Sequence, residues 1–307
     1  MSGTLQTIYQ NLRSFGVAEN TAAWFGAGYN AGNRSTVDRI TYATDTATAS
    51  VRGPLSLARY SFAAAGNTTN GWFGGGVGPL TSTVDRITYA SDNNTASVRG
   101  PLSSASAYMA AAGNTTDGWF GGGYGPGTIS TVQRITYATD TATASVRGPL
   151  SSARRHLDAA GNTTDGWFGG GDPGPVSTVD RITYATDTAT ASVRGPLSSA
   201  RAYLAAAGNT TDGWFGGGFP STSTVDRITY ATDTATASVR GPLSAVRSGL
   251  AAAGNTTDAW FGGGYGPGYV NRSTVDRITY ATDTATASVR GPLSLARGNL
   301  AAAGGIQ

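Results

Sequence analysis

The sequence predicts an all-β fold, a six-bladed β-propeller with four antiparallel strands in each blade. The first observation is a repeat, because GNTTDGWFGGG stands at 113–123 and recurs unchanged at 161–171 and 208–218. The second is its period, since successive tryptophans lie 46 to 48 residues apart, the length of one four-stranded blade. The third is composition: Gly contributes 45 of 307 residues and only 13% are charged, which suits short strands joined by tight turns.

Each repeat divides into four expected strands, as residues 201–247 illustrate. LAAAG forms the innermost strand A, because only small side chains fit where six strands converge on one axis. GWFGG forms strand B, whose Trp and Phe fill the gap between neighbouring blades. STVDRITYA forms strand C, in which Val, Ile and Tyr alternate with Thr, Asp and Arg. TASVRGPL forms strand D, which ends at Pro because Pro has no N–H to donate. The turns NTTD and TDTA connect A to B and C to D.

We expect an N-terminal segment at 1–18 and a single propeller domain at 19–307. Apolar residues at helical spacing predict a short amphipathic helix over residues 4–15, packed on the propeller. The expected blades cover approximately 19–55 together with 298–304, then 60–102, 107–150, 155–197, 202–243 and 248–292.

The two ends of the chain are expected to close the ring. The first copy begins at Thr21 and lacks its own strand A, whereas a further LAAAG stands at 300–304. Residues 300–304 are therefore expected to supply the inner strand of blade 1, which leaves no unpaired inner edge. The alternative is that residues 14–18 form this strand.

Composition and charge argue against several classes of protein. The formal charge is +3, every cation is an Arg, and acids are interspersed among them, so no basic face for nucleic acid is expected. The chain has no Cys and hence no disulfide framework, and no apolar run is long enough to cross a membrane. Residues 1–20 lack the apolar core of a signal peptide. We therefore expect a soluble, monomeric protein without membrane insertion.

The order of residues within each unit resembles the kelch repeat. Each unit reads Arg, small-residue strand, aromatic residue followed by Gly-Gly, loop, tyrosine strand, turn, strand, Pro and Arg, over nearly the whole chain after residue 18. The Gly-Gly pairs begin at Gly74, Gly121, Gly169, Gly216 and Gly262, and the tyrosines are Tyr42, Tyr89, Tyr137, Tyr184, Tyr230 and Tyr280. The kelch tryptophan that follows the tyrosine strand is absent, and the first copy reads GAG in place of GGG. The resemblance is therefore to a divergent kelch-type propeller.

This resemblance implies a binding platform, although some oxidases and sialidases use related architectures. Arrays of such uniform copies are also similar to those of environmental viruses, which makes association with a virion one expectation for localisation.

Differences among the copies concentrate in the loop between strands B and C and in the two residues before strand A. In an up-and-down blade these connections lie at the same end, so the variable positions are expected to share one face. The candidate ligand-binding residues on it are Tyr29, Tyr60, Tyr108, Tyr124, His156, Tyr203, Phe219, Tyr265 and Tyr269. Aromatic rings on loops over a rigid scaffold suit ligand contact, although surface loops also vary where nothing constrains them.

Arginines precede strand A in five copies: Arg59, Arg154, Arg201, Arg247 and Arg297; the third copy has Ser106. They form a candidate anion site, because guanidinium groups converging on the channel mouth would favour a carboxylate or phosphate. The alternative, which we favour, is that each forms a structural pair with an Asp or a backbone carbonyl of the next blade. Adjacent Asp and Arg residues on strand C face opposite sides and are expected to pair laterally between blades; Gln133 replaces this Asp once.

A catalytic site is not expected, because few residues that carry chemistry depart from the repeat. The singular candidates are Glu19, His156 and Asp172. His156 has no Cys or second His for a metal site, and TDTA lacks the spaced carboxylates of a calcium loop, so neither metal nor cofactor is expected. A sialidase-like glycosidase is a remote alternative, since Arg and Tyr abound but Glu19 is the single Glu.

The sequence thus predicts non-enzymatic recognition of a glycan or a surface protein through the variable aromatic face. The alternative is a purely structural repeat module of a larger assembly, such as a virus particle.

Overall fold

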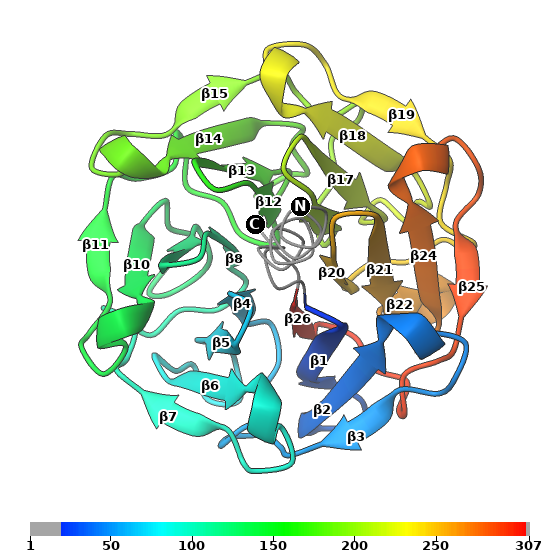
Figure 1. Cartoon of the computed structure of the whole chain (residues 1–307). Coiled ribbons are helices and arrows are strands. Elements are labelled where there is room, and N and C mark those ends of the chain that lie inside the picture. The colour runs from blue at the N-terminus through cyan, green and yellow to red at the C-terminus, as the bar shows by residue number, and fades with distance from the viewer. Residues whose placement is uncertain (1–19, 305–307) are drawn as a thin grey trace, which may run out of the picture.

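The computed structural model describes residues 20–304, and within this range the strands form a six-bladed β-propeller around a central channel (Figure 1). Each blade is a sheet of four antiparallel strands, as the repeat predicts.

Within each blade, the strands follow one another from the channel outward. Blade 1 contains β26 (Ala301–Ala303), β1 (Ala22–Tyr29), β2 (Asn33–Thr41) and β3 (Ser50–Arg52), and blade 2 contains β4 (Ala63–Gly66), β5 (Asn70–Gly74), β6 (Val84–Thr88) and β7 (Ser97–Arg99). Blade 3 contains β8 (Ala110–Gly113), β9 (Asp117–Gly121), β10 (Val132–Thr136) and β11 (Ser145–Arg147), and blade 4 contains β12 (Asp158–Gly161), β13 (Asp165–Gly169), β14 (Val179–Thr183) and β15 (Ser192–Arg194). Blade 5 contains β16 (Ala205–Gly208), β17 (Asp212–Gly216), β18 (Val225–Thr229) and β19 (Ser238–Arg240), and blade 6 contains β20 (Ala251–Gly254), β21 (Asp258–Gly262), β24 (Val275–Thr279) and β25 (Ser288–Arg290). The B–C loop of blade 6 adds the hairpin β22 (Tyr265–Gly266) and β23 (Val270–Asn271) around η7 (Pro267–Tyr269).

The C-terminal strand closes the ring, as expected. β26 pairs with β1 in antiparallel register, with Trp24 opposite Ala303 and Gly26 opposite Ala301. The helix expected over residues 4–15 and the alternative strand at 14–18 lie outside the described residues.

Strand C ends earlier than predicted. Its tyrosine does not continue the strand but opens a 3-10 helix in each blade: η2 (Tyr42–Thr44), η3 (Tyr89–Ser91), η4 (Tyr137–Thr139), η5 (Tyr184–Thr186), η6 (Tyr230–Thr232) and η8 (Tyr280–Thr282). The predicted alternation also misplaces the Asp of strand C, because Asp226 and its equivalents are fully buried. Both faces of a blade pack against neighbours, so alternation along the strand does not separate core from solvent.

The tryptophan of strand B holds each blade to the next. The indole of Trp214 in blade 5 stacks on Tyr280 of blade 6 with ring centroids 3.9 Å apart. The other five pairs are Trp24–Tyr89, Trp72–Tyr137, Trp119–Tyr184, Trp167–Tyr230 and Trp260–Tyr42. Each repeat supplies the Trp of one stacked pair and the Tyr of another. A change in one copy would therefore disturb the packing of a neighbouring blade, which explains why the motif is nearly identical in all copies.

The invariant turns have packing roles as well. The Asn67 side chain accepts the backbone N–H groups of Thr69 and Asn70, which closes the NTT turn, and its Nδ2 donates to the Thr115 carbonyl of the next blade. The turn after the 3-10 helix lies directly on the neighbouring blade, because a Cβ added to Gly241 would overlap the Ala285 carbonyl. These contacts account for the constancy of the A–B and C–D turns.

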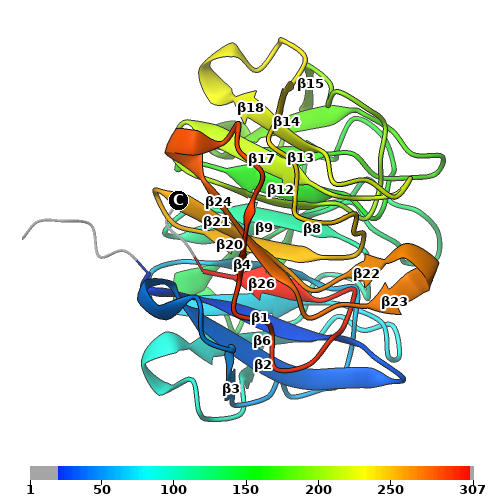
Figure 2. The ribbon, with the colours of Figure 1, turned by 90° about the vertical axis from the view of Figure 1, so that its right-hand side faces the viewer.

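The two ends of the described chain lie on the face formed by these invariant turns. Asn20 Nδ2 donates to the carbonyl of Asn67 at 3.1 Å, and Gly304 packs against Ala22 and Ala23. Figure 2 shows the β22–β23 hairpin at the opposite end of the molecule from the 3-10 helices that follow strand C. Among residues 20–304, no helix has the length and apolar character needed to cross a membrane.

Candidate functional site

The structure brings the two variable sets of residues together at one end, called the variable face below. In each blade the B–C loop pairs with the connection that precedes strand A, through bridges such as Tyr60 to Val77 and Arg155 to Asp172. The remaining bridges are Tyr29 to Gly298, Ala107 to Tyr124, Ala202 to Phe219 and Ser248 to Tyr265. The A–B and C–D turns form the opposite, invariant face.

Six equivalent residues form a ring at the mouth of the channel on the variable face: Ser61, Tyr108, His156, Tyr203, Gly249 and Asn299. Each donates its backbone N–H to the carbonyl of the equivalent residue in the preceding blade, at 2.6 to 2.9 Å. The chain of bonds is cyclic, because Ser61 N donates to the Asn299 carbonyl. All six backbone N–H groups of the mouth ring are thus used within the ring, so any further hydrogen-bond donors of these residues come from their side chains.

The mouth ring requires a left-handed backbone, with φ between 53° and 61° at all six residues. This region favours Gly, and another residue in it costs on the order of 1 kcal/mol. Gly249 shows that the ring accepts Gly, yet the other five positions carry side chains. Three of these side chains are rings: Tyr108, His156 and Tyr203.

The rings of the mouth form a continuous wall. His156 lies between Tyr203, at a centroid distance of 3.7 Å, and Tyr108, at 4.3 Å. With Ser61, Gly249 and Asn299 they surround a pocket of about 60 Å³. Its floor is an apolar layer from the residues that follow the mouth ring: Phe62, Met109, Leu157, Leu204, Leu250 and Leu300.

Further tyrosines extend this cluster. Burial, reinforced by the hydroxyls of Tyr29, Tyr60, Tyr108 and Tyr203, raises the pKa of Tyr265 to about 12. Burial and the neighbouring Tyr60 raise the pKa of Tyr108 to about 12. These phenols therefore stay protonated at neutral pH and can donate hydrogen bonds.

The other predicted aromatic residues lie farther out on the loops. Tyr124, Phe219 and Tyr269 are all exposed, and Tyr269 most of all, at 77%. Tyr124 contacts a charged side chain, with the Arg155 guanidinium 5.4 Å from its ring centroid.

Blade 4 carries on the variable face a cluster of Arg155, His156 and Asp172 that has no equivalent in the other copies. Arg155 Nε donates to Asp172 Oδ1 at 2.9 Å, and His156 Nδ1 lies 3.1 Å from Asp172 Oδ2. Burial lowers the pKa of His156 to about 4, an effect that Asp172 opposes only in part. His156 is therefore neutral, with the proton of Nδ1 facing the carboxylate.

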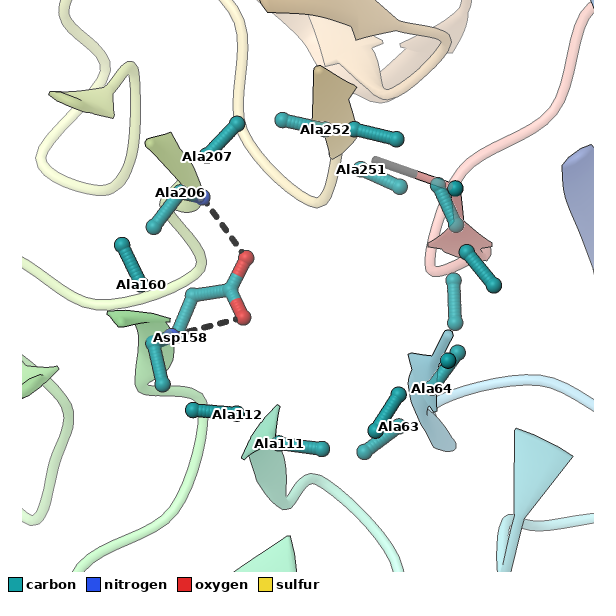
Figure 3. A pocket seen from close by; sticks show the side chains of 18 of the residues that line it. Ala63, Ala64, Ala111, Ala112, Asp158, Ala160, Ala206, Ala207, Ala251 and Ala252 are labelled. Carbon is teal, nitrogen blue, oxygen red and sulfur yellow. Dashed lines mark hydrogen bonds between the residues drawn. The ribbon is translucent and has the colours of Figure 1, made fainter. Parts of the chain in front are cut away.

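The channel below the apolar layer contains a cavity of about 130 Å³, lined by the Ala and Gly residues of the inner strands. Asp158 projects into it from β12, at a position that is Ala in every other blade (Figure 3). Its carboxylate accepts the N–H of Ala159 at 2.9 Å and that of Ala206 in blade 5 at 2.7 Å. Burial raises the pKa of Asp158 to about 7, although these two hydrogen bonds lower it.

The arginines of the candidate anion site lie inside the blades. Arg201 is 1% exposed and pairs with Asp226 on β18 of its own blade at 3.0 Å. The equivalent pairs are Arg59–Asp85, Arg154–Asp180, Arg247–Asp276 and Arg297–Asp38. Each guanidinium thus already holds a carboxylate of this chain, and the partner is in the same blade rather than in the next one.

Lateral pairing between blades does occur for the other member of the strand C pair. Arg227 Nη1 lies 3.1 Å from Asp283 Oδ2 in the turn of blade 6, and the strand C arginine of every other blade makes the same contact.

Blade 3 has lost both members of the buried pair. Ser106 stands in place of the Arg and Gln133 in place of the Asp. Gln133 Oε1 accepts the N–H of Ser103 at 2.5 Å and its hydroxyl at 2.7 Å. The two substitutions compensate each other, because neither leaves an unpaired buried charge.

Sequence reasoning singled out His156 and Asp172 but missed their partner Arg155 and the channel position of Asp158. A signal was present, since all four residues are departures from the repeat within one copy. Among residues 20–304, no cluster of acidic residues and His could hold a metal ion.

No protein-family model matches this chain, and a comparison with curated proteins found no relative.

Proposed function

We propose that this chain is a kelch-type, non-enzymatic recognition propeller that binds a glycan or a surface protein through its variable face. The observation that carries the proposal is the distribution of differences among the copies. The residues that hold the blades together are constant, whereas the B–C loops and mouth ring differ from blade to blade. A ligand of low symmetry requires such differences, and the scaffold does not.

The backbone of the mouth ring supports the same proposal. Tyr108, His156 and Tyr203 stand where Gly would be less strained, as Gly249 illustrates. Strain retained at several positions around one pocket is typical of sites that contact a ligand. Rigid phenol rings also provide contact area at a low cost in side-chain entropy.

The burial of the repeated arginines and the packing of His156 favour recognition without catalysis. A sialidase-like site needs free arginines, and the repeated arginines before strand A are buried against their own aspartates. His156 is enclosed between two phenol rings, which suits a packing and contact role.

A glycan array tests the proposal, using the protein and the variant Tyr108→Ala/Tyr203→Ala/Tyr265→Ala. A matched control is Val51→Ala/Val146→Ala/Val239→Ala, because these valines lie on the outer strands and are 59 to 60% exposed. We expect binding by the protein and by the control, and loss of binding in the tyrosine variant. Retention of binding by a folded tyrosine variant would show that the variable face is not the site.

A structural module of a larger assembly, such as a virus particle, is the second candidate. It is favoured by the equal exposure of a valine on the outer strand of every blade, since such a rim suits lateral contact between copies or neighbours. Sedimentation measurements distinguish the two functions. Concentration-dependent association that the valine variant abolishes supports the structural module, whereas a monomer at all concentrations supports recognition.

A further inference from the structure

We propose that blade 4 holds the specificity subsite of the variable face, and that this subsite takes an uncharged, hydroxyl-bearing ring such as a neutral pyranose. The inference rests on the proposed recognition function and narrows it to one blade and one class of glycan.

The first argument is that the charges of blade 4 are not needed for the fold. Arg155 and Asp172 form the same backbone bridge that uncharged residues form in the other blades. Ala107 and Ala202 are equivalents of Arg155, and Val77 and Phe219 are equivalents of Asp172. The scaffold thus tolerates uncharged side chains at both positions. The requirements of the fold therefore do not explain the ion pair in blade 4.

The second argument is the hydrogen-bonding capacity that the pair leaves open. Within the described chain, the Arg155 side chain donates through Nε alone, so its Nη groups remain available as donors. Arg155 is about one-third exposed, at 35%, and Asp172 is 17% exposed. Side by side, a guanidinium donor and a carboxylate acceptor match neighbouring hydroxyl groups, each of which can both donate and accept.

The third argument is that the subsite has no net charge. The carboxylate of Asp172 lies 2.9 Å from the Arg155 guanidinium, so the two charges cancel locally. His156, the third member, is neutral because burial holds its pKa low. The Asp172 carboxylate would repel an acidic ligand, and the Arg155 guanidinium would repel a cationic one. A neutral ligand experiences neither repulsion.

The fourth argument is the set of aromatic surfaces around the pair. Tyr124 lies under the Arg155 guanidinium, and Tyr203 and Tyr108 flank His156. Both flanking tyrosines are partly exposed; His156 stacks on Tyr203, with ring planes 22° apart, and is tilted by 60° to the ring of Tyr108. The C–H face of a sugar ring packs on such surfaces while its hydroxyls reach the ion pair.

The test compares variants that copy sibling blades and are therefore compatible with the fold. Arg155→Ala reproduces the residue of blades 3 and 5, and Asp172→Val reproduces that of blade 2. Ser248→Ala is the matched control, because it changes the position of Arg155 in blade 6. The array contains neutral pyranosides together with sialylated and uronic-acid glycans, and calorimetry with the best-bound array glycan gives the affinities.

We expect binding to neutral glycans, a loss of affinity of about tenfold or more in Arg155→Ala and in Asp172→Val, and less than a twofold change in Ser248→Ala. If the tyrosine variant loses binding but Arg155→Ala and Asp172→Val keep it, the blade 4 subsite is wrong and the recognition function stands. Binding to acidic glycans alone overturns the neutral class. A blank array overturns the inference, and the recognition function then depends on a protein partner whose binding the tyrosine variant abolishes.

Discussion

Trp214 Nε1 in blade 5 donates to Asp283 Oδ2 in blade 6 at 2.9 Å. The same carboxylate pairs with Arg227 and Arg240, and the Asp283 backbone carbonyl accepts the N–H of Gly241, so one residue contacts four residues of the preceding blade. The arrangement recurs at every boundary between blades, including the closing boundary, where Trp260 donates to Asp45. The Asp of the TDTA turn is thus the main polar link between neighbouring sheets.

Asp283→Ala should therefore lower the free energy of unfolding by about 3 kcal/mol, because it leaves the Trp214 N–H and the Arg227 guanidinium without their shared acceptor. Urea titration measures the loss. Thr284→Ala, which changes the exposed neighbouring residue, should alter stability by less than about 0.5 kcal/mol. Equal effects of the two substitutions would contradict the role assigned to Asp283.

The buried pair of Arg201 and Asp226 should show strong coupling. Arg201→Ser alone leaves the Asp226 carboxylate without its cation and should cost about 3 to 5 kcal/mol. Arg201→Ser/Asp226→Gln reproduces the combination found in blade 3 and should cost much less than either single change. A double-mutant cycle by chemical denaturation gives the coupling energy, and additive single effects would disprove compensation.

Asp158 should make stability fall as pH rises. Burial raises its pKa to about 7 in the folded chain, whereas an unfolded Asp has a pKa of about 4. The folded state thus binds the proton more tightly, and stability is lost as pH rises from about 4 to about 7.

Asp158→Ala, which restores the residue of the other five blades, should therefore stabilise the chain at pH 8 by up to a few kcal/mol more than at pH 4. Thermal unfolding of both proteins at the two pH values measures the difference, and other titrating groups cancel in the comparison. The same gain at both pH values would mean that Asp158 does not titrate in this range.

The strain in the mouth ring can be measured at Ser61, whose φ is 55°. Ser61→Gly should leave stability unchanged or raise it by up to about 1 kcal/mol, whereas Ser61→Val should lower it, because a β-branched residue is disfavoured in the left-handed region. Calorimetric melting temperatures of the two variants provide the test. A lower stability for the Gly variant than for the Val variant would rule out strain at this position.

Closure of the ring by β26 predicts the effect of truncation. Deleting residues 298–307 removes the strand that pairs with β1 and exposes the inner edge of blade 1. The melting temperature should fall by more than about 10 °C, and the truncated chain should become prone to association through the open edge. A synthetic peptide spanning 298–307 should restore part of the loss, and no change in melting temperature would show that β26 is dispensable.

Much of this fold could be predicted, because the repeat supplies the same information several times. The period gives the blade, the small residues of LAAAG identify the strand at the axis, and the extra copy at 300–304 identifies the closing strand. Alternation with Thr229 predicts that Tyr230 continues the strand. Its ring is instead directed onto Trp167 of the preceding blade, and the backbone turns into a 3-10 helix to place it there.

The candidate site could be predicted only in part. Strand topology fixes which end each loop occupies, so the sharing of one face by the variable residues followed from the fold. The pairing of charged side chains could not be predicted in this way, because spacing along the sequence does not indicate which Arg pairs with which Asp within a blade. Arg201 and Asp226 are 25 residues apart, and their contact joins the connection before β16 to β18, two strands farther out in the same sheet.

The position of Asn20 and Gly304 on the invariant face has a practical consequence for handling this protein. A tag, label or coupling chemistry placed at either end of the described chain points away from Tyr108, Arg155 and the other residues proposed to meet a ligand. A sensor surface that captures the molecule at Asn20 or Gly304 would therefore leave the variable loops facing the solution, and loops exchanged between blades could be compared on it directly.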